Sequence, residues 1–376
     1  MGRAAVVVTS VRVFLAGPLA SDTLRAAVLG RAVQGHAARL TDHAICADRA
    51  RVGLAAAPGA EADGLLVTLG PDEAARLGFY QTAVGLCPGT VTVAGATATA
   101  HLLAVPDAGP WQAASWVAQW GPTVAATAGD VMALWPEVPA RSVAARYGMM
   151  LVHGASRVRA AAEAPSGPCR RPGPDDLAVA RRRQVYARFF AVEEYDLRYR
   201  RFNGEMSPQV NRAVFLSGDA VTVLPYDPVR DRVLLVEQFR MGPFVRGDGQ
   251  PWLLEPIAGR VDPGETPEDT ARREAVEEAG LALGAVLPVA NYYPTPGAKA
   301  EYLYSFVAIA DLPDGVEGVF GIEGEAEDIR GHLVGFHRLM DLVASGAVSN
   351  GPLILTALWL QRERDGLRAA VARSAP

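Results

Sequence analysis

The sequence predicts an α+β protein that is built from two domains. Its 376 residues are long for one domain, and half of them are hydrophobic, so two domains could each bury a core. The segment EAPSGPCRRPGPDD, residues 163–176, contains four prolines and two glycines, which neither a helix nor a central strand accommodates. We therefore expect one domain in residues 1–163, a linker in residues 164–176 and a second domain in residues 177–376.

Charge and cysteine content argue against several classes of protein. The chain has 36 Lys and Arg against 41 Asp and Glu, so bulk electrostatics favours neither a nucleic acid nor a membrane surface as partner. Cys46, Cys87 and Cys169 are far apart and lack ligand spacing, which indicates a reducing compartment without disulfides or a zinc site. With no apolar run of about 20 residues and no signal-peptide pattern, we expect a cytoplasmic protein.

Strand-like segments dominate the first domain. Residues 11–21, VRVFLAGPLAS, predict a strand that runs into a Gly-Pro turn. Residues 62–81 predict a strand, a turn and a short helix, and residues 90–105 alternate β-branched with small residues. These patterns favour a small, mainly β-structured domain.

In the second domain, short strands surround strongly marked helices. Residues 220–227 and 231–240 are rich in strand-forming residues and are joined by the turn signal Asp227-Pro228. Residues 302–310 predict another buried strand, and residues 352–367 have the length and apolar spacing of a packed helix. The expected architecture is a mixed sheet with helices on its faces.

One helix of this domain has clear start and stop signals. Thr266 followed by Pro267 predicts its first turn, and Gly280 predicts its end. Residues 259–280, which include this helix, hold seven carboxylates in 22 residues. A solvated surface helix is the simple explanation for these acids, but the spacing of the acids argues against that explanation.

Three of these acids lie on one face of the helix. Glu274, Glu277 and Glu278 stand at positions i, i+3 and i+4, where like charges repel one another. Hard divalent cations would remove that cost, because Mg²⁺ takes carboxylate oxygens, waters and substrate phosphates as ligands. The preceding loop, residues 259–265, has two glycines and a proline, which brings its backbone to the same point.

The fixed residues of this region resemble the Nudix box, G-x5-E-x7-R-E-U-x-E-E-x-G-U, in which U is aliphatic. The matching residues are Gly259, Glu265, Arg273, Glu274, Glu277, Glu278, Gly280 and Leu281, with small Ala275 in the remaining aliphatic position. Similarity to bacterial ADP-ribose pyrophosphatases extends over about residues 180–365. It includes the segments FNGEMSPQVNRAVF, VLPYDPVRDRVLLVEQFR, PWLLEPIAGRVDPGE and EAEDIRGH, and a proline at position 296.

This resemblance implies a Nudix α/β/α sandwich and a metal-dependent hydrolase. The implied metal ligands are the Ala258 carbonyl and the carboxylates of Glu274, Glu278 and Glu327. Glu277 is implied as a further ligand or as an acid behind the ligands. The implied cation is Mg²⁺, with Mn²⁺ as a substitute.

The remaining catalytic assignments also follow from the resemblance. Glu325, in the segment GEAEDIR, matches the catalytic base of this subfamily, although a solvated acidic turn is the simpler interpretation of that loop. Arg273 is expected to orient the glutamates by ion pairing and not to touch the substrate. The implied reaction is hydrolysis of a pyrophosphate bond.

Several other residues match positions that bind the substrate. Arg212 and Arg240 are expected to grip the diphosphate and terminal ribose, for which a planar guanidinium is suited, with surface ion pairing as the alternative. Phe189 could stack on adenine or belong to the core. The resemblance also places Glu255 and Glu301 in substrate binding. Ala213 departs from the pattern, because these relatives often have an acid there.

ADP-ribose is the substrate that the resemblance implies, with AMP and ribose 5-phosphate as products. The partner is then a small nucleotide, and residues 186–215 match the segment through which the relatives form homodimers. Two alternatives stay open: another nucleoside diphosphate sugar or dinucleotide as substrate, or a non-catalytic regulator that binds ADP-ribose or an NAD-related metabolite. Retention of every box acid counts against the regulator.

The first domain, over about residues 10–160, resembles the γ-glutamylcyclotransferase-like fold, a small mixed β-barrel also called AIG2-like. Gly17 and Leu19 match its entry motif, whereas Ala16 and Pro18 do not. Gln81 stands where that family has its catalytic glutamate, and an amide cannot relay a proton near neutral pH. We therefore expect a degenerate module that binds a ligand or builds a dimer.

Overall fold

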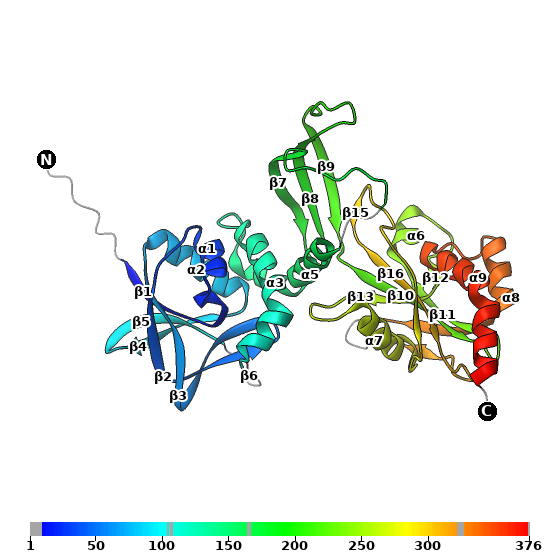
Figure 1. The fold of residues 1–376 in the computed structure, drawn as a ribbon, viewed down its shortest axis with the longest axis horizontal. Helices are drawn as coiled ribbons and strands as arrows, with labels where there is room; N and C mark the ends of the chain where they lie inside the picture. The colour runs from blue at the N-terminus through cyan, green and yellow to red at the C-terminus, as the bar shows by residue number, and fades with distance from the viewer. Residues whose placement is uncertain (1–9, 104, 106–107, 164–166, 322–326, 375–376) are drawn as a thin grey trace. The chain divides into compact units, whose positions relative to one another are not determined.

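The computed structural model describes residues 10–103, 105, 108–163, 167–321 and 327–374 (Figure 1). The chain divides into two compact units, Met1–Arg171 and Pro172–Pro376. The boundary between them falls within the proline-rich segment that the sequence marks as a linker. Over the described residues, no helix is both long enough and apolar enough to cross a membrane.

The first unit is organised around a curled, mixed sheet. Its strands in the order β4-β5-β1-β3-β2-β6 are β4 (Cys87–Val93), β5 (Ala96–Leu102), β1 (Val11–Ala16), β3 (Arg51–Leu69), β2 (His36–Asp48) and β6 (Gly109–Pro110). The long strand β3 pairs with β2 and β1, and Leu54 also meets Leu102 of β5. These pairings bend the sheet, and β1 ends in the predicted Gly-Pro turn.

Helices bury the core of this unit. They are the 3-10 helix η1 (Gly17–Ala20), α1 (Asp22–Leu29), α2 (Pro71–Ala83), α3 (Ala113–Met132), α4 (Ala140–Ala144) and α5 (Tyr147–Ala162). The sequence did not indicate α3, because Pro122 lies inside it and proline ordinarily breaks a helix. Burial of Trp116 and Trp120 in the core stabilises α3 despite this proline.

A mixed sheet forms the centre of the second unit. Its main path is β14-β16-β10-β11-β18-β17, with β12 paired to β11 and β13 paired to β10. The strands are β10 (Ala220–Asp227), β11 (Arg232–Phe239), β12 (Trp252–Glu255), β13 (Ile257–Arg260), β14 (Val286–Tyr292), β16 (Leu303–Ile309), β17 (Val319–Phe320) and β18 (Ile329–Gly335). The strands predicted at residues 220–227, 231–240 and 302–310 are thus confirmed as β10, β11 and β16.

Helices cover both faces of this sheet, which confirms the predicted sandwich. Helix α7 (Pro267–Ala279) buries its apolar residues against the face that carries Val221 and Val223. Helices α8 (Phe336–Ala344) and α9 (Gly351–Ser374) pack on the face that carries Leu224 and Tyr226. Successive side chains of a strand point to opposite faces, so β10 contributes apolar residues to both of these helix-covered faces. A short helix, α6 (Met241–Arg246), follows β11.

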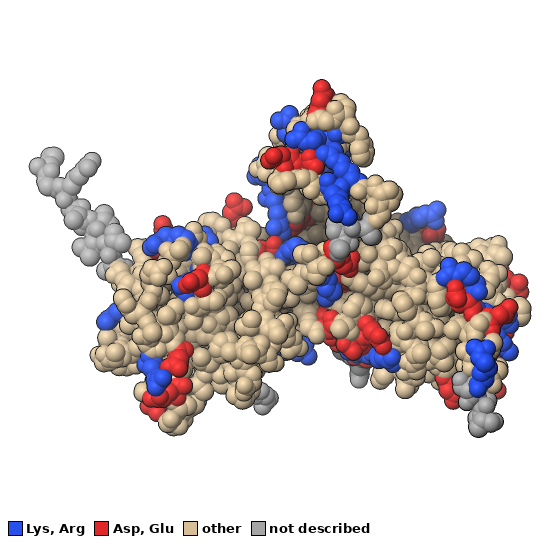
Figure 2. Space-filling model, viewed as in Figure 1, with Lys and Arg blue, Asp and Glu red and all other residues tan. Residues whose placement is uncertain are grey.

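A smaller sheet precedes the main one in the second unit. Its order is β15-β9-β8-β7, formed by β15 (Lys299–Ala300), β9 (Val210–Leu216), β8 (Ala191–Tyr199) and β7 (Leu177–Ala187). Figure 2 shows basic side chains gathered over β7 to β9 and acidic side chains gathered over α7. The candidate active site lies where α7, β13 and the end of β11 meet.

Candidate active site

Helix α7 begins and ends where the sequence predicts. The Thr266 hydroxyl accepts a hydrogen bond of 3.2 Å from the Asp269 backbone N–H, which is an N-cap worth about 1 kcal/mol. Pro267 occupies the first helical position, and Gly280 ends the helix in the left-handed conformation with φ of 61°. These caps fix which turns present the three box glutamates.

Gly259 lets the loop before α7 approach the helix. A Cβ atom at this position would overlap the carboxylate of Glu274, so no larger residue fits without moving that side chain. Gly259 is itself held in β13, where it pairs with Val221 of β10. The main sheet therefore determines how close the loop backbone lies to the acids of α7.

Arg273 holds three acids of the box together. Its Nε donates to Glu265 at 3.0 Å, and its Nη1 donates to Glu274 at 2.7 Å and to Glu277 at 2.8 Å. Its Nη2 also donates to the Arg260 carbonyl at 3.2 Å. Arg273 therefore fixes the carboxylates relative to the loop.

Glu278 is the most enclosed acid of the cluster. Only 4 % of the residue is exposed, and its Oε2 accepts a hydrogen bond of 3.2 Å from the Ala258 backbone N–H. Burial raises the pKa of Glu278 to about 8, the Ala258 hydrogen bond opposes this rise, and the charges of Glu274 and Glu327 add to it. The surroundings of Glu278 therefore disfavour its charged form unless a cation lies beside it.

Glu274 lies in the same environment. Burial raises its pKa to about 7, against the opposing effect of Arg273, and Glu277 and Glu327 raise it further. Glu327 thus acts electrostatically on Glu274 and Glu278 although it comes from a distant segment of the chain. A divalent cation would fit this set chemically, since it provides hard oxygen ligands and an excess of negative charge. Among the described residues, no three His, Cys, Asp or Glu side chains are already close enough together to hold a metal ion.

Arg240 reaches the same region from the end of β11. Its Nε and Nη2 donate to Glu255 Oε2 at 2.9 and 2.6 Å. Burial lowers the pKa of Arg240, but Glu255 and, to a smaller extent, Glu278 and Glu327 raise it above its ordinary value. Arg240 is therefore a cation beside the acidic cluster, and Glu255 is the buried residue that holds it.

Phe189 lies on the surface and not in the core. The residue is 63 % exposed, which leaves its ring available, and the Arg260 guanidinium lies 4.7 Å from the ring centroid. Arg260 follows Gly259 directly, so this contact brings the aromatic side chain to the loop before α7. Arg260 was not predicted from the sequence, because its contact with Phe189 depends on the fold.

Other predicted residues lie elsewhere or outside the described part of the chain. Arg212 is exposed on β9 and donates to the Asn211 carbonyl at 2.9 Å. Glu301 accepts hydrogen bonds from Ser217 at 2.8 Å and from Lys299 at 3.0 Å. Within the described residues, no hydrogen bond joins either residue to the acidic cluster. Glu325 lies outside the described residues.

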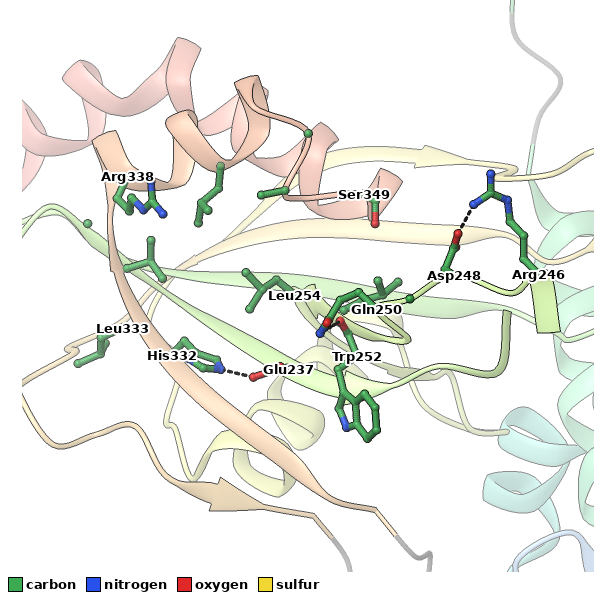
Figure 3. A pocket seen from close by; sticks show the side chains of 17 residues that line it. Glu237, Arg246, Asp248, Gln250, Trp252, Leu254, His332, Leu333, Arg338 and Ser349 are labelled. Atoms are coloured by element: carbon green, nitrogen blue, oxygen red, sulfur yellow. Dashed lines mark hydrogen bonds and ion pairs between the residues drawn. The ribbon is translucent and has the colours of Figure 1, made fainter. Parts of the chain in front are cut away.

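A groove of about 920 Å³ lies beside β12 and β18 (Figure 3). His332 Nε2 and Glu237 Oε2 meet at its wall, 2.7 Å apart. Leu254 and Ser349 also line it, and they directly precede Glu255 and Asn350 in the sequence. Asn350 was not predicted as a functional residue. Its sequence signal is that an Asn followed by Gly351-Pro352 is typical of the start of a helix.

Comparison with known proteins agrees with this arrangement. A profile of the NUDIX domain matches residues 216–355. The chain is 38% identical over 196 residues to ADP-ribose pyrophosphatase of Escherichia coli, covering 52% of this chain and 93% of that protein. It is 33% identical over 201 residues to ADP-ribose pyrophosphatase of Haemophilus influenzae, covering 53% and 92%.

A relative of different specificity is also similar. GDP-mannose pyrophosphatase of Salmonella paratyphi B is 35% identical over 167 residues, covering 44% of this chain and 84% of that protein. The matches to the two ADP-ribose pyrophosphatases span nearly the whole length of those proteins, and the profile includes the box from Gly259 to Leu281. The chain belongs to the Nudix family.

Proposed function

We propose that the second domain hydrolyses ADP-ribose to AMP and ribose 5-phosphate. The observation that carries this proposal is that a cation, Arg240, lies close enough to the box acid Glu278 for their charges to interact. Glu278 also interacts with Glu274 on the same helix. The similarity to two ADP-ribose pyrophosphatases supports the choice of substrate. Water adds to one phosphorus of the diphosphate, and the bond from that phosphorus to the bridging oxygen breaks. The bridging oxygen leaves with the other phosphate, and the attacking water gives up a proton to a base.

The metal-binding residues in this proposal are Glu274, Glu278, Glu327 and the Ala258 carbonyl, with Glu277 supporting them. Nudix hydrolases generally need a divalent metal, and we propose Mg²⁺, with Mn²⁺ able to replace it. Such a cation stabilises charge that develops on phosphate oxygens and lowers the pKa of a bound water. Arg273 keeps two of the acids in place through hydrogen bonds of 2.7 and 2.8 Å.

The proton of the attacking water needs an acceptor, and we assign that role to Glu325. Its neighbour Glu327 is close enough to the α7 acids to raise the pKa of both Glu274 and Glu278, which supports placing this loop at the reaction. A carboxylate is suited to general base catalysis.

Recognition of the substrate is assigned to residues outside the box. We assign Arg240 to a phosphate oxygen, and the support is that Glu255 holds its guanidinium in one orientation. Phe189 offers an exposed ring for the adenine. Arg212 and Glu301 remain proposed substrate contacts.

A panel of nucleoside diphosphate compounds tests the proposal. The protein is incubated with Mg²⁺ and, separately, ADP-ribose, GDP-mannose, ADP-glucose and NADH, and the phosphate monoester products are quantified. The expected result is the highest kcat/KM for ADP-ribose, with AMP and ribose 5-phosphate in equal amounts. A higher kcat/KM for GDP-mannose would contradict ADP-ribose as the preferred substrate. Binding of ADP-ribose without hydrolysis would favour a non-catalytic regulator.

Another nucleoside diphosphate sugar is the second candidate, because a GDP-mannose pyrophosphatase is 35% identical to this chain. The residues outside the box decide between the two substrates. Arg260 contacts the ring of Phe189 and thereby affects the surface offered to the base. Comparison of kcat/KM for adenine and guanine substrates measures this choice directly.

We also propose that the second domain forms a homodimer through its smaller sheet. Exposed apolar side chains on this sheet support the proposal, because a monomer would leave them in water. They include Leu177, Val179, Val185 and Tyr186 on β7 and Tyr199 on β8. Sedimentation velocity at micromolar concentration should give a dimer, and Val179→Glu should shift it toward the monomer. An active wild-type monomer would contradict the proposal.

For the first domain, we propose a γ-glutamylcyclotransferase-like fold without cyclotransferase activity. Its curled mixed sheet supports this, and so does Gln81, which is buried and cannot relay a proton. Among the described residues, the Gln81 Nε2 has no hydrogen-bond partner. Incubation of the protein with γ-glutamyl amino acids should release no 5-oxoproline. Measurable release would identify an active domain.

A further inference from the structure

Asn350 joins helix α9 to the region of the candidate active site. Its Nδ2 donates a hydrogen bond of 3.0 Å to Glu255 Oε1, across 95 residues of sequence. Its Oδ1 accepts a hydrogen bond of 2.9 Å from the Leu353 backbone N–H. Because the two ends of the amide meet different partners, one an acceptor and one a donor, its orientation is fixed.

Glu255 divides its two oxygens between Asn350 and Arg240. Oε1 accepts from Asn350, and Oε2 accepts from Arg240 Nε and Nη2 at 2.9 and 2.6 Å. Only 4 % of Glu255 is exposed, so a charged carboxylate there needs these donors. Loss of the Asn350 donor would free the Glu255 carboxylate to rotate. Rotation would move Oε2 and, with it, the Arg240 guanidinium that donates to Oε2.

The far end of this chain of hydrogen bonds is rigid. Asn350 immediately precedes α9, whose residues Leu353, Ala357 and Leu360 are buried without measurable exposure in the core on that face of the sheet. Leu254 and Ser349, which precede Glu255 and Asn350 in the sequence, line the groove (Figure 3). A water molecule in place of the amide would not fix the Glu255 carboxylate in one rotamer.

We propose that Asn350 is a positioning residue that sets the place of Arg240 through Glu255 and thereby strengthens substrate binding. This rests on the proposed function, in which Arg240 binds a phosphate oxygen of ADP-ribose. Asn350 does not touch substrate. Its effect is therefore expected on KM, since a phosphate contact that is equal in the ground and transition states is uniform binding.

Two substitutions separate this role from helix capping. Asn350→Ser and Asn350→Asp both keep an oxygen that can cap α9, since Ser, Asp and Asn are comparable N-caps. Ser is too short to reach Glu255, and Asp directs a second carboxylate toward it. We expect kcat within about twofold and KM raised on the order of 10-fold for Ser and more for Asp, together with a lower thermal midpoint because the buried Glu255 carboxylate loses a donor.

A reversal of donor and acceptor provides the rescue. In the double variant Glu255→Gln with Asn350→Asp, the new amide at position 255 donates to the new acid at 350, and its oxygen still accepts from Arg240. KM of the double variant should be lower than that of Asn350→Asp alone, which gives a non-additive double-mutant cycle. Ser349→Ala, at the neighbouring position, is the control and should keep the wild-type KM.

A crystal structure of Asn350→Ser gives a readout that does not depend on turnover. Displacement of the Glu255 carboxylate and of Arg240 is the expected result. An unchanged KM with Arg240 in place would overturn the proposal, as would a fall in the thermal midpoint as the sole effect. Wild-type protein that fails to hydrolyse ADP-ribose would instead reject the proposed function, and the position of Arg240 in the variant would still test Asn350.

Discussion

The Ala258 backbone N–H donates a hydrogen bond of 3.2 Å to Glu278 Oε2, and this bond ties strand β13 to helix α7. The two residues are 20 positions apart. A buried carboxylate is thereby held against the residue whose carbonyl is a proposed metal ligand. The strand and the helix therefore present their ligands as one unit, which is the arrangement that a preorganised metal site needs.

Glu278→Gln is expected to reduce kcat by orders of magnitude and to preserve the fold. The amide keeps the size of the side chain and can still accept the Ala258 hydrogen bond, but it loses the negative charge that would bind a cation. Steady-state hydrolysis of ADP-ribose measures the loss. Near-normal kcat in a folded variant would show that Glu278 is not a metal ligand.

Thermal unfolding with and without Mg²⁺ provides the control for this variant. A cation that binds the folded state raises the midpoint of wild-type protein. The midpoint of Glu278→Gln should respond much less to Mg²⁺ and should be at least as high as that of wild type without metal, since Gln stays neutral at a position where burial disfavours a charge.

Arg240→Ala is expected to raise KM for ADP-ribose more than it lowers kcat. The substitution removes a cation from beside the acidic cluster and leaves Asn350, among the described residues, as the remaining side-chain donor to Glu255. Arg246→Ala is a matched control, because that arginine pairs with Asp248 on the surface. Equal KM values for all three proteins would mean that Arg240 has a structural role only.

A chain that begins at Pro172 should keep most of the ADP-ribose hydrolysis. The second compact unit begins there, and the shortened chain retains Asp176, which accepts a hydrogen bond of 2.8 Å from Arg200 Nε. Every proposed catalytic and substrate-binding residue also lies after this point. The kcat/KM of the shortened and full-length proteins is the comparison. A folded but inactive product would show that the first domain helps to build the site.

Asp231 is expected to make the second domain sensitive to acid. A hydrogen bond from Arg364 and one from Tyr226 lower the pKa of Asp231 to about 2, and partial burial opposes them. The unfolded chain binds this proton near the ordinary pKa of 3.8 and the folded chain does so near 2. The stabilisation is therefore present above about pH 4 and is lost as pH falls toward 2.

Unfolding of Asp231→Asn as a function of pH measures this contribution. The variant should be less stable than wild type at pH 7, and the difference should shrink between about pH 4 and 2. Asp314→Asn is the control, since Asp314 is almost fully exposed beside Arg232 and such pairs contribute little. A constant difference across this pH range would exclude the charged form of Asp231 as the cause.

Much of the second domain was determined by local sequence. Helix α7 is recognisable because Thr266, Pro267 and Gly280 satisfy backbone groups or φ angles that only a helix terminus presents. Strands β10 and β16 are recognisable because an apolar run bounded by turn residues must be buried on both faces. The spacing of Glu274, Glu277 and Glu278 also predicts a shared face, because side chains three and four residues apart are neighbours on any α-helix.

Only the tertiary structure decided which distant residues support that face. Arg240, Glu255 and Asn350 come from three separate elements, and their hydrogen bonds depend on how the end of β11, β12 and the start of α9 meet. Likewise, Arg260 meets Phe189 because β13 brings it to the smaller sheet. Local sequence specifies backbone hydrogen bonding and the burial pattern of each element, whereas contacts between elements depend on packing that no single segment encodes.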